Sequence, residues 1–198
     1  MYQQYQSGWI EVITGPMFAG KSEELIRRVN TLTYTKKKIM AFKPKIDDRY
    51  DKSAISSHSG MKYQGYAIND CKEILSYITD DVDVIAIDEV QFFSDEIVQI
   101  CEDLANAGKR VIVAGLDLDF RGEPFGPMPQ LITRAEIVTK LTAICTVCSM
   151  AATRTQRLID GKPADIDDPT ILVGAKESYE ARCRKHHVVL HSGGKKDE

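Results

Sequence analysis

Eight consecutive residues carry the strongest chemical signal in this sequence. They match the pattern G-x-x-x-x-G-K-S, in which backbone N–H groups of a glycine-rich loop turn inward around a polyphosphate. In this pattern the lysine reaches the β- and γ-phosphates, and the serine hydroxyl holds Mg²⁺. We therefore expect a nucleotide to contact the residues of this phosphate-binding loop, which are Gly15, Pro16, Met17, Phe18, Ala19, Gly20, Lys21 and Ser22.

The sequence on either side of the loop supplies the strand and the helix that it needs. Residues 9–13 are rich in β-branched side chains and predict a strand. Apolar residues then recur at helical spacing, at Leu25, Ile26, Val29 and Leu32. A helix that begins near Lys21 adds the positive end of its dipole to the phosphate site. A turn that contains Gly-Lys-Ser by chance is the alternative, and both flanks argue against it.

Two adjacent carboxylates, Asp88 and Glu89, follow a second apolar run. The run at 82–87 is typical of a buried parallel strand, whose carboxyl end often carries chemistry. Downstream of a phosphate-binding loop, an acidic residue at this position holds Mg²⁺, and we assign that role to Asp88. The neighbouring Glu89 points a different way and is free to act as a base. A solvated pair of carboxylates is the alternative, which the loop upstream makes less favoured.

A third group of residues has the spacing of a metal site. Cys145 and Cys148 form one C-x₂-C pair, and Cys183 and His186 form a matching C-x₂-H pair much later in the chain. Together they supply four ligands for tetrahedral zinc, which indicates a structural rather than a catalytic site. The alternatives are free thiols, redox chemistry of the first pair, and His187 as a rival fourth ligand at a less suitable spacing.

Strands and helices alternate along most of the chain. Besides the elements around the loop, the pattern predicts strands at 39–42, 82–87, 111–114 and 136–141, and helices at 71–78 and 95–107. This alternation specifies an α/β fold with a parallel, doubly wound sheet. After Leu141, cysteines, short strands and turn residues replace it, so we expect two units, at 1–142 and 143–198. Turn residues at 160–163 predict a connection between two strands.

A polar segment at 43–65 interrupts the alternation. Long polar loops in compact α/β domains are often lids or binding loops. A surface loop without function fits the composition equally well, so the residues alone leave both readings open.

Composition excludes several broad classes of function. The 198 residues carry a net charge of −3, with a pI near 5.9, and offer no broad basic field for nucleic acid. The N-terminal residues lack the features of a signal peptide, and no apolar run has membrane-spanning length. The five cysteines are an odd number, and three of them belong to the metal pattern. Reduced thiols, as in the cytoplasm, fit this better than disulfides.

These motifs together resemble the type II thymidine kinases, the cytosolic kind. The resemblance runs in order along nearly the whole chain. It is carried by G-P-M-F-A-G-K-S-E-E-L from residue 15, D-E-V-Q-F-F from 88, G-L-D-L-D-F-R-G from 115, the two metal pairs and G-A-K-E-S-Y from 174. Each motif alone is shared with other families, but the set is specific. Some family members have a cysteine where His186 stands, and either residue type binds zinc.

The resemblance implies a RecA-like domain, a small zinc domain with a lasso loop, and a homotetramer. It implies transfer of the γ-phosphoryl group of MgATP to the 5′-hydroxyl of thymidine or deoxyuridine in the cytoplasm, with feedback inhibition by dTTP. Glu89 matches the base, and the segment with Asp88, Val90 and Gln91 adjoins the nucleotide. The positions that match the thymidine site are Met17, Leu116, Phe120, Thr155, Val173, Gly174 and Tyr179, and those that match the mobile lid are Asp48, Arg49 and Tyr50.

Two other functions remain to be weighed against this one. A RecA-like ATPase that acts on nucleic acid would keep the ATP site, but it needs a basic track or a second motor domain, and the sequence shows neither. A zinc-knuckle binding module without catalysis would leave the phosphate-binding loop and its carboxylates without a purpose. ATP hydrolysis stimulated by polynucleotide would favour the first, and a lack of ATP binding would favour the second.

Overall fold

A six-stranded sheet forms the centre of the computed structural model, which describes residues 8–45, 54–56, 62–170 and 177–191. The strand order is β5-β2-β6-β7-β1-β8, and all neighbouring strands in it are parallel. The strands of this sheet are β1 (Trp9–Thr14), β2 (Lys38–Pro44), β5 (Tyr66–Ile68), β6 (Val82–Ile87), β7 (Arg110–Gly115) and β8 (Ile137–Lys140).

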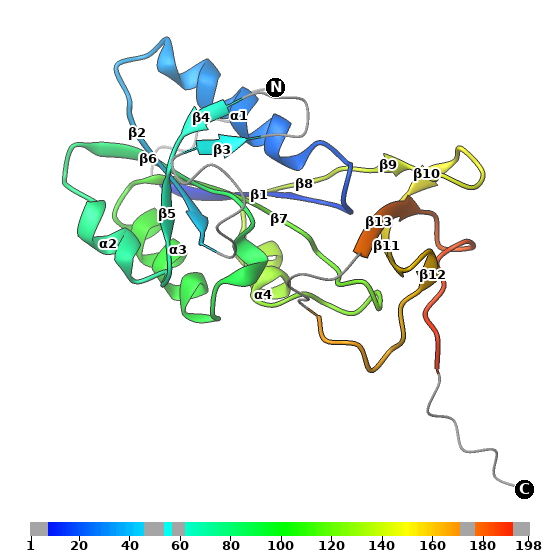
Figure 1. The fold of residues 1–198 in the computed structure, drawn as a ribbon. Coiled ribbons are helices and arrows are strands. Elements are labelled where there is room, and N and C mark those ends of the chain that lie inside the picture. The colour runs from blue at the N-terminus through cyan, green and yellow to red at the C-terminus, as the bar shows by residue number, and fades with distance from the viewer. Residues whose placement is uncertain (1–7, 46–53, 57–61, 171–176, 192–198) are drawn as a thin grey trace, which may run out of the picture.

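Helices cover both faces of the sheet (Figure 1). Side chains alternate between the faces, as strand geometry requires, so that on β1 Val12 and Ile13 belong to different hydrophobic cores. The core around Ile13 lies under α1, and the core around Val12 lies under the other three helices. The helices are α1 (Lys21–Thr33), α2 (Glu73–Tyr77), α3 (Glu96–Asn106) and α4 (Met128–Arg134). The predicted doubly wound α/β fold is therefore confirmed.

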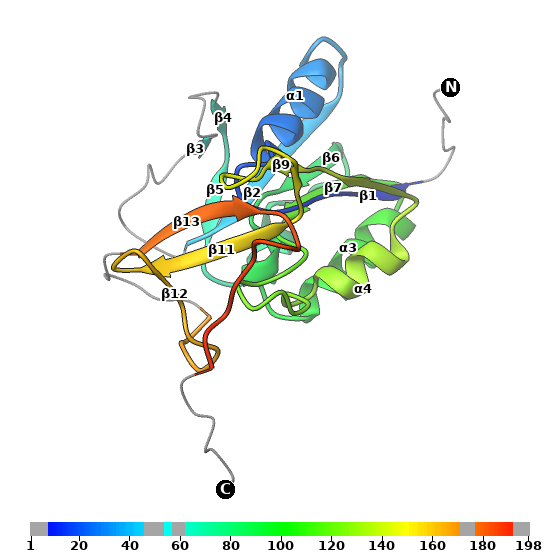
Figure 2. The same ribbon diagram turned by 90° about the vertical axis from the view of Figure 1, so that its right-hand side faces the viewer.

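A smaller unit lies beyond the carboxyl ends of the central strands, where β11 and β13 run side by side (Figure 2). It contains a two-stranded sheet, β10-β9, and a three-stranded sheet, β12-β11-β13, both antiparallel. Its strands are β9 (Ala143–Ile144), β10 (Ala151–Ala152), β11 (Arg154–Ile159), β12 (Lys162–Pro163) and β13 (Glu177–Arg182). The unit thus faces the edge of the sheet where the chemistry of parallel sheets is found.

Most of the expected elements lie within a few residues of the observed ones, but some were missed. The turn at 160–163 joins β11 to β12 as predicted. The sequence did not predict β5 or α4, and the polar segment at 43–65 contains an antiparallel pair, β3 (Ala54–Ser56) and β4 (Lys62–Gln64). Residues 46–53 and 57–61 lie outside the described residues, so the lid stays a prediction. No helix in the described part of the chain has the length and apolar character needed to cross a bilayer.

Candidate active site

The phosphate-binding loop connects the end of β1 to the start of α1. Gly15 has a φ of 136°, and a Cβ placed on it would lie 2.3 Å from the carbonyl oxygen of Leu141. Only glycine fits there, because neither the backbone conformation nor the space admits a side chain. Gly20 adopts a left-handed conformation directly before the helix begins at Lys21. The loop therefore delivers the chain into the helix with free N–H groups at its first turn, the arrangement that binds phosphate.

Lys21 is buried at the base of this loop and faces several carboxylates. Its Nζ donates to the carbonyl oxygen of Pro16 at 2.8 Å, and only 8% of the residue is exposed. Burial lowers the pKa of the Lys21 ammonium, while the carboxylates of Glu89, Asp88 and Asp117 act in the opposite direction. The ammonium is thus held at the carboxyl edge of the sheet, where a phosphate oxygen could take the place of the Pro16 carbonyl.

Asp88 stands at the end of β6 and faces the serine of the loop. It is 5% exposed, and its carboxylate accepts a hydrogen bond from the Ser22 hydroxyl. Burial, followed by the Glu89 carboxylate, raises the pKa of Asp88 to about 7, although the Ser22 hydrogen bond lowers it. A carboxylate and a hydroxyl oxygen are the ligands that Mg²⁺ prefers, and a bound cation would stabilise the charged form of Asp88. These two residues therefore fit a magnesium site.

Glu89 turns away from Asp88 because its backbone is left-handed, with a φ of 51°. One oxygen of its carboxylate accepts a hydrogen bond from Gln91 Nε2 at 2.5 Å. Gln91 is buried, and its own Oε1 accepts from the backbone N–H of Leu116 at 3.1 Å. Gln91 lies in the short 3₁₀ helix η1 (Val90–Phe92), so it holds Glu89 while joining the ends of β6 and β7. The sequence placed Gln91 near the nucleotide but gave no sign of this orienting contact.

Some of the residues that are predicted to contact thymidine lie close together in the structure. The backbone N–H of Met17 in the phosphate-binding loop donates to Thr155 Oγ1 on β11 at 3.0 Å, and Thr155 is buried. Leu116 follows the end of β7, where its N–H is held by Gln91. Tyr179 lies on β13, directly across from β11. The structure thus joins the phosphate-binding loop to the smaller unit at this point.

Phe120 is 5% exposed, and the guanidinium groups of two arginines lie against its ring. The guanidinium carbons of Arg121 and Arg157 lie 4.4 and 5.1 Å from the ring centroid. Arg121 also donates to the carbonyl oxygen of Ile166 at 2.7 Å and to Thr170 Oγ1 at 2.7 Å, which ties this loop to the segment that precedes residue 171. Stacking of a pyrimidine on Phe120 stays a prediction.

Some predicted residues fall outside the described part of the chain. They are the lid positions Asp48, Arg49 and Tyr50 and the lasso positions Val173 and Gly174. Their roles stay predictions from the resemblance.

The four predicted zinc ligands lie together in the smaller unit. Their ligand atoms are all within 4.8 Å of one another, with Cys148 Sγ 3.8 Å from Cys183 Sγ and Cys145 Sγ 3.8 Å from His186 Nδ1. Four ligands at Zn–S bond lengths of ~2.3 Å in a tetrahedron have sulfurs about 3.8 Å apart. The spacing therefore fits a zinc ion without rearrangement.

The pKa values of two thiols in this cluster shift in opposite directions. A backbone hydrogen bond from Met150 lowers the pKa of Cys148, but burial and the thiols of Cys145 and Cys183 outweigh it and raise that pKa. Burial raises the pKa of the Cys145 thiol, but backbone hydrogen bonds from Cys183, Val147 and Cys148 and the His186 ring outweigh it, and the pKa falls to about 5. Zinc binds the thiolate rather than the thiol, so Cys145 is prepared for the metal.

His187, the rival ligand, points out of this cluster. Its Nε2 lies 2.8 Å from the carbonyl oxygen of Phe120, while His186 lies with the three cysteines.

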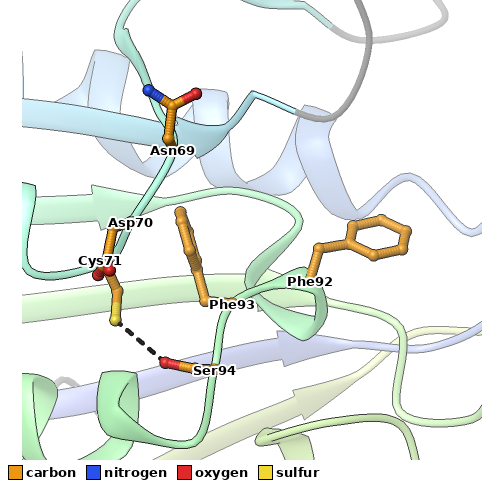
Figure 3. A pocket seen from close by; sticks show the side chains of 6 residues that line it. All are labelled: Asn69, Asp70, Cys71, Phe92, Phe93 and Ser94. Atoms are coloured by element: carbon orange, nitrogen blue, oxygen red, sulfur yellow. Dashed lines mark hydrogen bonds between the residues drawn. The ribbon is translucent and has the colours of Figure 1, made fainter.

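A small pocket lies beside η1, at the end of β5 (Figure 3). Its volume is about 100 Å³, below the roughly 300–1,000 Å³ of small-molecule sites. The lining residues are Asn69, Asp70, Cys71, Phe92, Phe93 and Ser94, and Cys71 Sγ lies 3.6 Å from Ser94 Oγ. The pocket does not include the residues that face Lys21, so it is not the phosphate site.

The fold and the site define a P-loop nucleotide-binding protein, and one solved structure shares the fold. The chain is similar to the flagellar accessory protein FlaH from Methanocaldococcus jannaschii, with 13% identity and a TM-score of 0.51 over 74% of this chain and 76% of that one. This identity shows a shared fold and nothing more. The family model for thymidine kinase matches residues 8–187, and the chain therefore belongs to the thymidine kinase family.

Two other solved structures give weaker matches. They are domain III of the replication initiation protein DnaA from Thermotoga maritima (16% identity, TM-score 0.40) and the ATPase DotB from Legionella pneumophila (17% identity, TM-score 0.48). The matches cover 67% and 74% of this chain, which spans 54% of the DnaA domain and 44% of DotB.

Proposed function

We propose that this protein is a thymidine kinase of nucleotide salvage, which transfers the γ-phosphoryl group of ATP to the 5′-hydroxyl of thymidine or deoxyuridine. The observation that supports it most is the geometry around Lys21 in a chain of the thymidine kinase family. A buried lysine, a carboxylate paired with the loop serine, and a second carboxylate held by an amide lie at one edge of the sheet. These are the groups that phosphoryl transfer requires.

The phosphate-binding loop and Lys21 hold and neutralise the triphosphate. Phosphoryl transfer depends on alignment and on stabilisation of charge more than on covalent help. Loop N–H groups and the Lys21 ammonium supply this to the β- and γ-phosphates. Ser22 and Asp88 hold Mg²⁺, which neutralises further negative charge on the phosphates when it is bound.

Glu89 is the general base. Its carboxylate accepts the proton of the 5′-hydroxyl as the oxygen forms its bond to phosphorus and the bond to the β-phosphate oxygen breaks. Gln91 orients this carboxylate by donating to Oε2, and the backbone of Leu116 fixes Gln91 in turn. A base that is already oriented loses less entropy on reaching the reactive geometry.

The nucleoside lies between the phosphate-binding loop and the smaller unit. The hydrogen bond between Met17 and Thr155 brings the two parts into contact at this position. The family resemblance supplies the remaining contacts, which are Leu116, Phe120, Val173, Gly174 and Tyr179. A site closed around the nucleoside excludes water, which limits wasteful hydrolysis of ATP.

The zinc site is structural, because protein ligands fill all four positions. It closes the chain segment between Cys148 and Cys183, which contains the thymidine residues of the smaller unit. We further propose from the family resemblance that 1–142 and 143–198 are separate functional units and that the enzyme is a cytoplasmic homotetramer inhibited by dTTP. Nucleic acid and membranes are not among its proposed partners.

A panel of nucleosides incubated with MgATP tests the proposal. We expect monophosphate formation from thymidine and deoxyuridine and much less from ribonucleosides. Glu89→Gln should bind both substrates while turnover falls about 10²–10⁴-fold, the usual contribution of a general base. ATP hydrolysis that responds to polynucleotide but not to thymidine would contradict the proposal, and so would normal turnover of the Glu89→Gln variant with an unchanged pH dependence.

A further inference from the structure

His187 directly follows a zinc ligand, but its side chain contacts a different part of the molecule. The ring Nε2 lies 2.8 Å from the carbonyl oxygen of Phe120, and the ring also lies within hydrogen-bonding reach of the Thr155 backbone. Because a carbonyl oxygen can only accept, Nε2 carries the hydrogen. One half-buried imidazole thus contacts two of the residues that we assign to the thymidine site.

The surroundings of His187 leave its ring little freedom. The next residue, Val188, exchanges two hydrogen bonds with the buried side chain of Gln156 on β11, each 2.8 Å long. On the other side, a Cβ added to Gly122 would lie 3.6 Å from the ring Cε1, so the imidazole packs against the turn that follows Phe120. The backbone and the ring are both fixed, which is what a residue that holds another group in place requires.

The contacts of His187 lie in a continuous path from the metal cluster to the phosphate-binding loop. His186 belongs to the cluster, and His187 reaches Phe120 and Thr155. Thr155 Oγ1 in turn accepts from the N–H of Met17. Contiguous contacts of this kind can carry a displacement from one site to another.

We propose that His187 is a positioning residue, which transfers the geometry fixed by zinc to the loop of Phe120 and to Thr155. It contacts neither metal nor substrate. The inference rests on the proposed function for the assignment of Phe120 and Thr155 to thymidine. Loss of the His187 hydrogen bond should therefore weaken thymidine binding, while the zinc site and the catalytic groups around Lys21 remain intact.

A matched pair of variants isolates the hydrogen bond. His187→Gln and His187→Met have side chains of similar length, but only glutamine keeps an N–H that can donate to Phe120. We expect the methionine variant to show a roughly three- to tenfold higher KM for thymidine, which corresponds to the loss of one hydrogen bond. Its KM for ATP, its kcat and its zinc content should stay close to those of the wild type, and the glutamine variant should restore the KM for thymidine.

A second readout needs no activity. Amide hydrogen exchange in the loop 116–126, measured without nucleoside, should be faster in the methionine variant than in the wild type or the glutamine variant. His191→Ala, which removes an exposed histidine from the same tail, is the control and should change neither readout.

Unchanged exchange and an unchanged KM for thymidine in the methionine variant would overturn the inference. Loss of zinc from that variant would also overturn it, because His187 would then act on the metal cluster itself. If the wild-type protein phosphorylates no thymidine, the proposed function fails, and exchange in the loop 116–126 still decides the inference.

Discussion

Two neighbouring carboxylates, Asp88 and Glu89, have different contacts because the backbone between them changes conformation. Asp88 directly follows the end of β6 and meets Ser22, whereas the left-handed backbone of Glu89 turns its carboxylate toward Gln91. The backbone N–H of Glu89 also donates to Asp88 Oδ1 at 2.9 Å, which stabilises this turn. A metal ligand and a base can therefore be adjacent in sequence without competing for the same partner.

Gln91 should affect turnover through its hydrogen bond to Glu89. Replacing it by leucine removes the donor to the Glu89 carboxylate and leaves the N–H of Leu116 without its acceptor. A hydrogen bond to a charged group contributes about 1.5–3 kcal/mol, so we expect kcat to fall roughly tenfold or more, with a small change in the KM for ATP. Steady-state kinetics measure this. Gln99→Leu, an exposed glutamine on α3, is the control, and equal rates for both variants would remove Gln91 from the role.

Asp88 should make the stability of the protein without bound Mg²⁺ depend on pH. Its pKa is raised from 3.8 to about 7 in the folded state, so the folded protein binds this proton more tightly than the unfolded chain does. The stability that the protonated Asp88 carboxyl contributes is fully present below its pKa in the unfolded chain. It is lost as the pH rises through its pKa in the folded protein. The Asp88→Asn variant has a neutral side chain at every pH. The Tm of this variant minus the Tm of the wild type should therefore increase between about pH 4 and pH 7 and stay constant above pH 7.

Thermal unfolding of the zinc-loaded protein in buffer without Mg²⁺ measures this difference. Addition of MgATP should reduce it, because a bound cation offsets the cost of the charged carboxylate in the wild type alone. A gain in Tm that is the same at all pH values would contradict the assignment.

At the scale of elements, the site depends on how closely the ends of β6 and β7 approach. Gly115 ends β7, and a Cβ on it would lie 2.6 Å from Gln91 Oε1 and 2.9 Å from Met128 Sδ. The absence of a side chain lets Gln91 cross from η1 to the N–H of Leu116. Gly115, the last residue of β7, thus helps to determine where Gln91 holds the carboxylate of Glu89, which follows the neighbouring strand β6.

Gly115→Ala should therefore lower both activity and stability. Overpacking of this kind costs about 1–3 kcal/mol, and the displaced Gln91 should lower kcat as far as Gln91→Leu does. Gly108→Ala is a suitable control, because φ is 82° there and a Cβ would meet no atom within 4 Å. It should lose stability through backbone strain of about 1–2 kcal/mol and keep its kcat. Normal kcat in Gly115→Ala would show that Gln91 adjusts without loss.

The length and the apolar pattern of each element explain which elements the sequence could predict and which it could not. Long apolar runs predicted β6 and β7, because strands buried on both faces leave that pattern. β5 has only three residues. α4 has seven, with prolines at its N-cap (Pro127) and in its first turn (Pro129), so neither element shows a clear period. The contact between Gln91 and Glu89 depends on a left-handed residue that no composition rule marks. The contact between Met17 and Thr155 spans 138 positions and follows from the fold alone.

At the scale of the whole molecule, the zinc unit and the phosphate-binding loop form one continuous structure. A small hydrophobic cluster in the zinc unit contains Cys145, and Ala19 of the loop packs against it, as do Cys148 and Cys183. The hydrogen bond from Met17 to Thr155 makes a second contact between the two. The hydrophobic cluster that contains one of the four metal ligands thus lies against the loop itself.

Loss of zinc should consequently weaken the binding of both substrates. Cys183→Ser removes one ligand, and because a tetrahedral site with three protein ligands holds structural zinc poorly, the metal should be released. Without it, β11 and the tail that carries His187 lose their common anchor, so the KM for thymidine should rise most. The KM for ATP should rise roughly fivefold, as expected for the loss of a single hydrogen bond between Met17 and Thr155.

Metal analysis and the two KM values measure these effects, with Cys71→Ser as the control. Cys71 is a buried thiol outside the zinc cluster, so its replacement should leave the zinc content at one per chain and both KM values unchanged. A zinc-free Cys183→Ser variant with a raised KM for thymidine and a normal KM for ATP would show that the loop keeps its shape without the zinc unit. A zinc-free variant in which both values stay normal would mean that the metal stabilises a part of the fold that neither substrate needs.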